Sequence, residues 1–301
     1  MSYREELPCR RYVASLERDP PLEGALTLEH GFIPARPNRA ELPVSHRPWD
    51  AVAADLPDLF VSNRAQRVLE RLPTLDATAR ALPDEALARA SVVLSALGHA
   101  YWRFGAQRFF PRRTTQVDGA LPPSILVPWR EVSRRLGRHE PERPFQSFYD
   151  LFLANYRFRE GLSADVPKTI ENLEVLVPSF RNEAERVFYM SFVEMHHHLT
   201  PLVRAVCEIE AGTFADDVDA VLRALARIQD ALVRATGVWQ RISARAGSRT
   251  FCDPVLWSKT AAILGVPPDG TPQGATSGAS APMLHVLDAL LGRQSYDSRY
   301  G

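Results

Sequence analysis

The sequence LPPSILVPWREVSRRLGRHEPERPFQSFYDLFLANY, residues 121 to 156, is the part of the chain that constrains the architecture most. Proline lacks an amide donor and clashes with the preceding helical turn, so Pro122, Pro123 and Pro128 predict an extended lead across the surface. Residues 129 to 136 then predict a short amphipathic helix. Residues 145 to 156 predict a second helix, which is apolar on several sides and therefore buried.

The second predicted helix is rich in aromatic residues, and two interpretations of them stay open. One is core packing, since aromatic side chains dominate most protein cores. The other is a wall of a pocket for a flat ligand. The side chains concerned are Phe145, Phe148, Tyr149, Leu151, Phe152 and Tyr156.

The composition narrows the class of protein. The 301 residues are 45% hydrophobic, enough for one large domain or two modest ones with a core. Lysine plus arginine and aspartate plus glutamate number 36 each, so no net charge attracts nucleic acid or an anionic membrane. No segment reaches the roughly 18 consecutive apolar residues that suggest a membrane span. We therefore expect neither a nucleic-acid nor a membrane partner.

Cysteine usage indicates a reducing compartment. Cys9, Cys207 and Cys252 are odd in number and widely separated, which predicts neither a disulfide framework nor a Cys-x-x-Cys metal site. The charged N-terminus, MSYREELPCRRY, lacks the apolar core of a signal peptide. These features predict a cytoplasmic protein.

Helical periodicity is found along most of the chain, and no two segments alternate as paired strands do, so we expect an all-α fold. Residues 84 to 104 predict a central helix. Asn182 and Glu185 have the spacing of a capping box, and Pro201 should interrupt the helix that they open. Residues 216 to 245 predict a long amphipathic scaffold helix, because apolar residues recur there at three- and four-residue spacing.

The order of motifs resembles that of the indoleamine 2,3-dioxygenase family. The shared elements are LPP-x-I-x-VPW-x-x-V-S-x-x-LG and D-x-x-LANY within residues 121 to 156, preceded by Gly31-Phe32-Ile33-Pro34, Leu42-Pro43, Trp49-Asp50 and Leu56-Pro57-Asp58-Leu59. The resemblance covers about residues 30 to 292. It implies a two-domain helical fold, with an N-terminal arm and small domain over residues 1 to 160 and a large haem-type domain over residues 161 to 301.

The resemblance also implies an activity. Family members are haem-dependent dioxygenases that insert O₂ across the C2–C3 bond of an indole, in tryptophan catabolism and the kynurenine pathway. The cofactor carries that chemistry, so the protein need supply no strong acid or base. The implied partners are an indole-type small molecule and O₂. By this resemblance Ser191 is the catalytic residue, and the pocket is lined by Phe148, Leu151, Phe152, Val187, Phe188, Trp257, Ser277 and Gly278.

The sequence departs from the family pattern in three ways. Val187 stands where an aromatic residue is usual. The arginine that pairs with the substrate carboxylate has no counterpart near Ala262, and Lys259, the nearest cation, lacks the bidentate fork of arginine. The region with the proximal histidine is not found before Gly301, so we expect a C-terminally shortened fold.

Two histidines remain as candidate metal ligands, His285 and His196. His196 opens a run of three, and consecutive helical residues point about 100° apart, so the three cannot chelate one ion together. Packing, contact with the edge of the haem and axial ligation all stay open for them. An alternative to the enzyme is a non-catalytic or cofactor-free binding module, with a partner at the face that the short C-terminus exposes.

Overall fold

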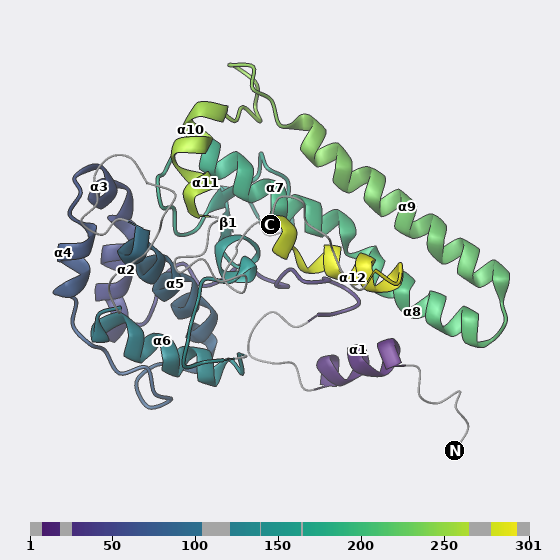
Figure 1. Ribbon diagram of the computed structural model, residues 1–301, viewed down its shortest axis with the longest axis horizontal. Helices are drawn as coiled ribbons and strands as arrows, with labels where there is room; N and C mark the ends of the chain where they lie inside the picture. Colours follow the sequence, from purple (N-terminus) through teal and green to yellow (C-terminus); the bar gives the residue numbers. More distant parts are fainter. Residues whose placement is uncertain are drawn as a thin grey trace.

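The computed structural model describes residues 8–18, 26–103, 121–138, 140–163, 165–264 and 278–293. Figure 1 shows one group of helices, α2 to α6, beside a second group that contains the long helices α7, α8 and α9. The helices are α1 (Pro8–Arg18), α2 (Arg47–Ala54), α3 (Leu56–Val61), α4 (Ala65–Glu70), α5 (Leu87–Arg103), α6 (Pro123–Arg135), α7 (Glu183–Leu199), α8 (Pro201–Phe214), α9 (Val218–Arg241), α10 (Pro254–Lys259), α11 (Ala261–Leu264) and α12 (Pro282–Leu290).

The all-α prediction is confirmed for the described part of the chain. The described residues include two short strands, β1 (Tyr156–Phe158) and β2 (Leu173–Val175). They form one antiparallel pair in which Tyr156 lies opposite Val175. Short 3₁₀ turns precede α2, α5 and α12. No helix among the described residues has the length and apolarity that a membrane crossing requires.

Two hydrophobic clusters hold the helices together. The small core gathers around α2, α5 and α6, and Trp49, Leu94 and Trp129 are fully buried in it. The large core gathers around α7, α8 and α9 and includes Phe148, Leu151, Phe152, Leu153 and Tyr156. The division into domains at residue 160 stays a prediction.

Helices α5 and α6 pack closely because Gly98 has no side chain. A Cβ atom at Gly98 would lie 2.4 Å from Cζ3 of Trp129, a distance at which the indole must move. This close approach buries the Trp129 ring completely and fixes α6 against the centre of α5.

The extended lead predicted for residues 121 to 128 is wrong, since α6 begins at Pro123 and contains Pro128. Pro123 starts the helix, where an amide has no partner in any case. Pro128 gives up one hydrogen bond to the carbonyl of the preceding turn. Burial of Ile125, Trp129 and Val132 in the small core offsets that loss.

The helix predicted over residues 145 to 156 is also wrong in its extent. The segment forms one π-helical turn, η4 (Tyr149–Leu153), closed by a bond from the amide of Ala154 to the carbonyl of Tyr149 at 2.8 Å. The backbone amide of Asp150 donates to Ser147 Oγ at 3.1 Å, so the helical turn begins only there. Tyr156, expected on a helix, belongs to β1.

Three other helical predictions are confirmed. The central helix is α5, preceded by the turn Asp84–Ala86. Asn182 caps α7 by accepting the amide of Glu185 at 2.9 Å, and α7 ends at Leu199, before Pro201 begins α8. The long amphipathic helix is α9, which ends at Arg241 because Ile242 is extended.

We expect Gly98→Ala to destabilise the protein by about 1–3 kcal/mol, because the added methyl group overpacks the contact with Trp129. Gly237→Ala is the matched control, since nothing lies within 4 Å of its Cβ position near the C-terminal end of α9. That control should be neutral or stabilise by about 0.5–1 kcal/mol. Urea unfolding of both variants measures the difference, and equal free energies would contradict the packing argument.

Candidate functional site

Six aromatic rings, five in or against the large core and one, Trp239, 39% exposed at its edge, form what we call the aromatic cluster. They come from η4, α7, α9 and α10, four elements that are distant in sequence. The members are Phe148, Phe152, Phe188, Phe192, Trp239 and Trp257.

Phe188 and Phe192 connect the rings of the cluster, because they lie one helical turn apart on α7. Phe192 packs against Phe152 with ring centroids 4.5 Å apart and meets Trp239 edge to face at 5.2 Å. Phe188 meets Trp257 edge to face at 5.2 Å. Edge-to-face contact is the preferred geometry of aromatic pairs. The cluster therefore forms a continuous apolar wall.

Four of the residues expected to line a pocket belong to this arrangement. Phe148, Phe152, Phe188 and Trp257 are members of the aromatic cluster. Gly278 adjoins it, because a Cβ atom there would lie 3.6 Å from Cζ of Phe192. Ser277 lies outside the described residues.

Leu151, Val187 and Ser191 are buried near the cluster without belonging to it. Leu151 and Val187 pack in the large core. Ser191 has no exposed surface, and its hydroxyl donates to the carbonyl of Phe188 at 2.6 Å. This bond within α7 engages the hydroxyl proton. Only the lone pairs of Ser191 Oγ are therefore free to accept a hydrogen bond from a ligand.

His196 is the histidine of the triple run that points inward. Its Nδ1 lies 2.8 Å from the carbonyl oxygen of Phe192, which can only accept, so Nδ1 carries the proton. Burial lowers the pKa of His196 to about 4, and the ring is therefore neutral at pH 7. Its Nε2 is buried without a hydrogen-bond partner in the described structure, and the ring of Phe148 lies 5.4 Å away.

The other histidine candidates lie nearer the solvent. His285 is exposed on α12, His197 is exposed, and His198 is half-buried. Partial burial of the imidazole, together with the positive charges of Lys168 and of the neighbouring histidines, lowers the pKa of His197. Within the described ranges, no three His, Cys, Asp or Glu side chains are grouped so that they could hold a metal ion.

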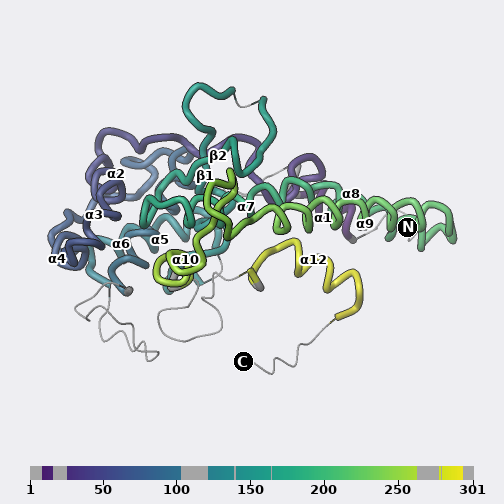
Figure 2. Tube along the Cα trace, turned by 90° about the horizontal axis from the view of Figure 1, so that it is seen from above, coloured from purple at the N-terminus to yellow at the C-terminus, as the bar shows by residue number. Residues whose placement is uncertain are grey.

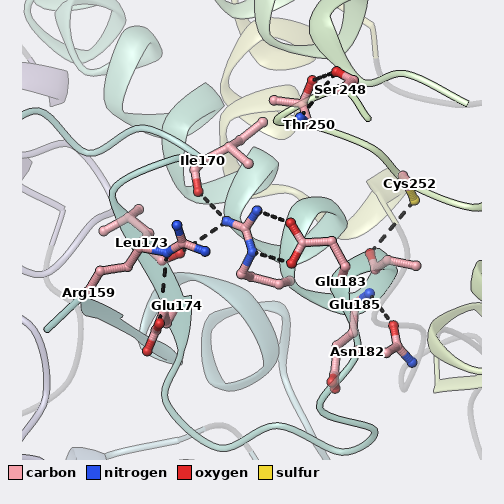
Figure 3. A network of polar contacts seen from close by, with 12 residues as sticks. Arg159, Ile170, Leu173, Glu174, Asn182, Glu183, Glu185, Ser248, Thr250 and Cys252 are labelled. Atoms are coloured by element: carbon pink, nitrogen blue, oxygen red, sulfur yellow. Dashed lines mark hydrogen bonds and ion pairs between the residues drawn. The ribbon is translucent and has the colours of Figure 1, made fainter. Parts of the chain in front are cut away.

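The start of α7 is fixed by polar contacts that Figure 3 shows from close by. The guanidinium of Arg186 donates to the carbonyls of Ile170 and Leu173 and pairs with Glu183. The buried carboxylate of Glu185 accepts the amides of residues 179 to 181. These bonds fix the position of α7, and with it those of Phe188, Phe192 and His196.

Asp150 fixes η4 from the opposite side. This buried carboxylate accepts from Arg138 at 2.6 Å and from the hydroxyls of Ser91 and Ser147 at 2.7 Å each. Burial by itself would raise the pKa of Asp150, but the charge of Arg138 and these hydrogen bonds outweigh it. The pKa therefore lies below its ordinary value.

Sequence reasoning missed two members of the aromatic cluster as site residues, Phe192 and Trp239. Phe192 follows Phe188 by four residues, which puts both rings on one face of a helix. Trp239 ends the apolar repeat of α9 and donates its indole N–H to Met195 Sδ at 3.0 Å. The spacing of Phe192 was a usable signal, whereas the position of Trp239 depends on how α9 packs on α7.

The comparison with known proteins identifies one family. The model of a family described as indoleamine 2,3-dioxygenase matches residues 25–259, more than half of the chain. Indoleamine 2,3-dioxygenase 1 of Rattus norvegicus is 28% identical over 216 residues, which cover 71% of this chain and 47% of that protein.

Two further relatives extend the comparison. Indoleamine 2,3-dioxygenase 2 of Homo sapiens is 26% identical over 286 residues, 90% of this chain and 65% of that protein. An indoleamine 2,3-dioxygenase of Penicillium citrinum is 38% identical over 113 residues, 37% of this chain and 23% of that protein. The chain thus spans less than two thirds of the length of each of these relatives.

Removing the charge of Asp150 should destabilise the protein strongly. We expect Asp150→Asn to cost about 3–5 kcal/mol, because it leaves Arg138 without its buried partner. Asp84→Asn is the matched control, since Asp84 pairs with Arg135 but is 60% exposed, and it should cost less than about 1 kcal/mol. Urea unfolding at pH 7 measures both.

The same variants test a pH dependence. The lowered pKa of Asp150 means that its contribution is complete above its unfolded pKa of about 3.9 and is lost as the pH falls through the folded pKa. The acid loss of stability should therefore be shallower in Asp150→Asn than in the native protein. Parallel pH profiles for the two proteins would show that Asp150 does not titrate as described.

Proposed function

Because the chain belongs to the indoleamine 2,3-dioxygenase family, we propose that it is a haem-dependent dioxygenase that inserts O₂ across the C2–C3 bond of an indole. The observation that carries this proposal is the aromatic cluster, whose six rings come together beside Gly278 and Ser191. Flat apolar walls and a glycine suit a flat aromatic ligand, because the backbone can approach it closely.

The donor chemistry of the described residues fits haem. A histidine that holds haem iron must be a neutral imidazole with a free lone pair, and a hydrogen bond at its other nitrogen fixes the tautomer. His196 meets these requirements, since Nδ1–H is bonded to Phe192 and Nε2 has no partner in the described structure. His196 would therefore hold the iron. The side chain of His196 is fully buried and its ring centroid lies 5.4 Å from that of Phe148, so the core around it must rearrange before Nε2 becomes accessible.

The haem supplies activation of O₂ when it is bound, and the protein has three other tasks. The buried rings of the cluster, Phe148, Phe152 and Phe192, would keep water from one side of the indole, and the cluster would orient the indole ring. The buried Nε1 of Trp257 has no partner in the described structure and can donate to a ligand. Ser191 Oγ can accept a hydrogen bond while its proton stays on the Phe188 carbonyl.

The substrate that fits best is an indole derivative whose carboxylate is bound by a single point charge and not by two hydrogen bonds from one guanidinium. Lys259 ends α10 two residues beyond Trp257 and is exposed, so it offers a point charge rather than a bidentate contact. Tryptophan and related indoles are the compounds to test. A cytoplasmic location is part of the proposal, supported by the three free cysteines.

A second candidate function is a cofactor-free binding module. Two observations favour it, namely the direct contact of Phe152 with Phe192 at 4.5 Å and the complete burial of His196. Rings that fill their own space need no cofactor to complete the core. Haem titration separates the two functions.

We expect the 301-residue chain to bind one haem with a shifted Soret band, and His196→Ala to lose the band or to weaken binding at least tenfold. His285→Ala is the matched control, because this exposed histidine should leave the spectrum unchanged. Absorption spectra during the titration measure both. Equal binding by His196→Ala would reject His196 as the ligand, and no binding by the native chain would favour the module.

A further inference from the structure

A carboxylate of α8 binds the start of α1. Glu210 accepts the backbone amide of Cys9 with both of its oxygens, at 3.0 and 3.1 Å. The two helices lie beside each other in both views (Figures 1 and 2). Val13, about one turn after Cys9, is 3% exposed and belongs to the large core. The first turns of α1 therefore attach the N-terminal arm to the large core.

The same contact brings two of the three cysteines together. Cys207 precedes Glu210 by three residues, so the two side chains are neighbours on one face of α8. Cys207 belongs to the large core, and the half-buried Cys9 packs against that core. The charge of a Cys207 thiolate also contributes to the raised pKa of Cys9. Two thiols that are far apart in the sequence are thus close in space.

The packing of two helices allows a disulfide between them. The axes of packed helices are roughly 8–10 Å apart, and each Cα atom lies about 2.3 Å from its axis. Facing Cα atoms therefore approach to roughly 4–5 Å. A disulfide joins Cα atoms that are about 4.4–6.8 Å apart, so the two ranges overlap.

Both thiols are protonated at neutral pH. Burial, and then the Glu210 carboxylate through its charge and a hydrogen bond from the thiol, raise the pKa of Cys9 to about 11. Burial and the charge of Glu210 also raise the pKa of Cys207. Exchange needs the thiolate, so the pair reacts slowly at pH 7. Ionisation does not favour the reduced form either, so a disulfide between the two sulfurs resists reduction once it has formed.

We propose that Cys9 and Cys207 are a redox-sensitive pair, which a small disulfide such as glutathione disulfide converts into an internal disulfide between α1 and α8. Cys9 reacts first, because it is half-buried whereas Cys207 is 7% exposed. Its sulfur attacks one sulfur of glutathione disulfide, the S–S bond of that molecule breaks, and one glutathione leaves with the proton of Cys9.

The second step closes the bond within the protein. The sulfur of Cys207 attacks the sulfur of Cys9 in the mixed disulfide, and the second glutathione leaves with the proton of Cys207. Two protein thiols are oxidised, and one glutathione disulfide is reduced to two thiols.

The disulfide changes how the N-terminal arm is attached. In the reduced chain α1 is held by non-covalent contacts, so it can open locally while the rest of the protein stays folded. In the oxidised chain a covalent bond joins Cys9 to the large core and prevents this opening. Oxidation therefore controls whether α1 can leave α8.

Glutathione buffers test the pairing directly. The reduced native chain is equilibrated at about pH 8, where exchange is faster, with increasing ratios of glutathione disulfide to glutathione. Peptide mass spectrometry without reduction should then find Cys9 joined to Cys207 within one chain, and Cys252 still a thiol. Cys252 is in another part of the large core, where its thiol donates to the carbonyl of Ala184 at 3.7 Å. A pair that stays reduced at a roughly hundredfold excess of glutathione disulfide would overturn the proposal.

Three serine variants assign the roles of the sulfurs. Cys207→Ser should stop at the mixed disulfide of Cys9 with glutathione, because the resolving thiol is missing. Cys9→Ser should leave Cys207 at least about tenfold slower to react than Cys9, because Cys207 is more deeply buried. Cys252→Ser is the matched control and should form the internal disulfide as the native chain does. Loss of the disulfide in Cys252→Ser would assign the bond to Cys252 and contradict the pairing. Thermal unfolding confirms that each variant is folded.

Hydrogen exchange measures the effect on the arm. The backbone amides of α1 should exchange at least about tenfold more slowly in the oxidised native chain than in the reduced one. Cys9→Ser, treated with the same buffer, should show no change. Equal exchange of α1 in the oxidised and reduced native chains would show that the disulfide does not control the attachment of this helix.

Discussion

The buried carboxylate of Asp150 joins the two hydrophobic cores, and the positions of the site residues depend on it. Asp150 accepts from Ser91 of α5 and from Arg138, just beyond the end of α6, so it ties η4 to the helices of the small core. Phe148 and Phe152 of the same segment pack on α7 in the large core. A buried charge is tolerated only when it is paired and hydrogen-bonded, and this requirement fixes where the turn lies.

Helix α7 is the second fixed reference in the molecule. Its first turn is held by the Asn182 cap and by Arg186, and its end is set by Pro201 at the start of α8. Because Phe188, Ser191, Phe192 and His196 all belong to this helix, their relative positions follow from helical geometry alone. The aromatic cluster then depends only on which rings the neighbouring elements bring to α7.

Helix α9 supports the candidate site with one part of its surface and exposes another. Arg241 near its end pairs with the buried Glu194 of α7 at 2.6 Å, and Trp239 contacts both Phe188 and Phe192. The same helix keeps other apolar side chains exposed, among them Leu222, Leu225 and Val233.

Residue patterns determined the helical class, the cap and break of α7, and the length of α9 to within a few residues, because these depend on local periodicity and on the missing amide of proline. The same reasoning failed for Pro128, where tertiary burial of Trp129 outweighed a local penalty, and for residues 145 to 156, where Asp150 sets the turn. Motifs brought Phe148, Phe188 and Trp257 to attention, but only packing showed that Phe192 and Trp239 join them. The burial of His196 and the exposure of Leu222 and Leu225 on α9 were decided by the tertiary structure alone, since periodicity shows that a face is apolar but not what covers it.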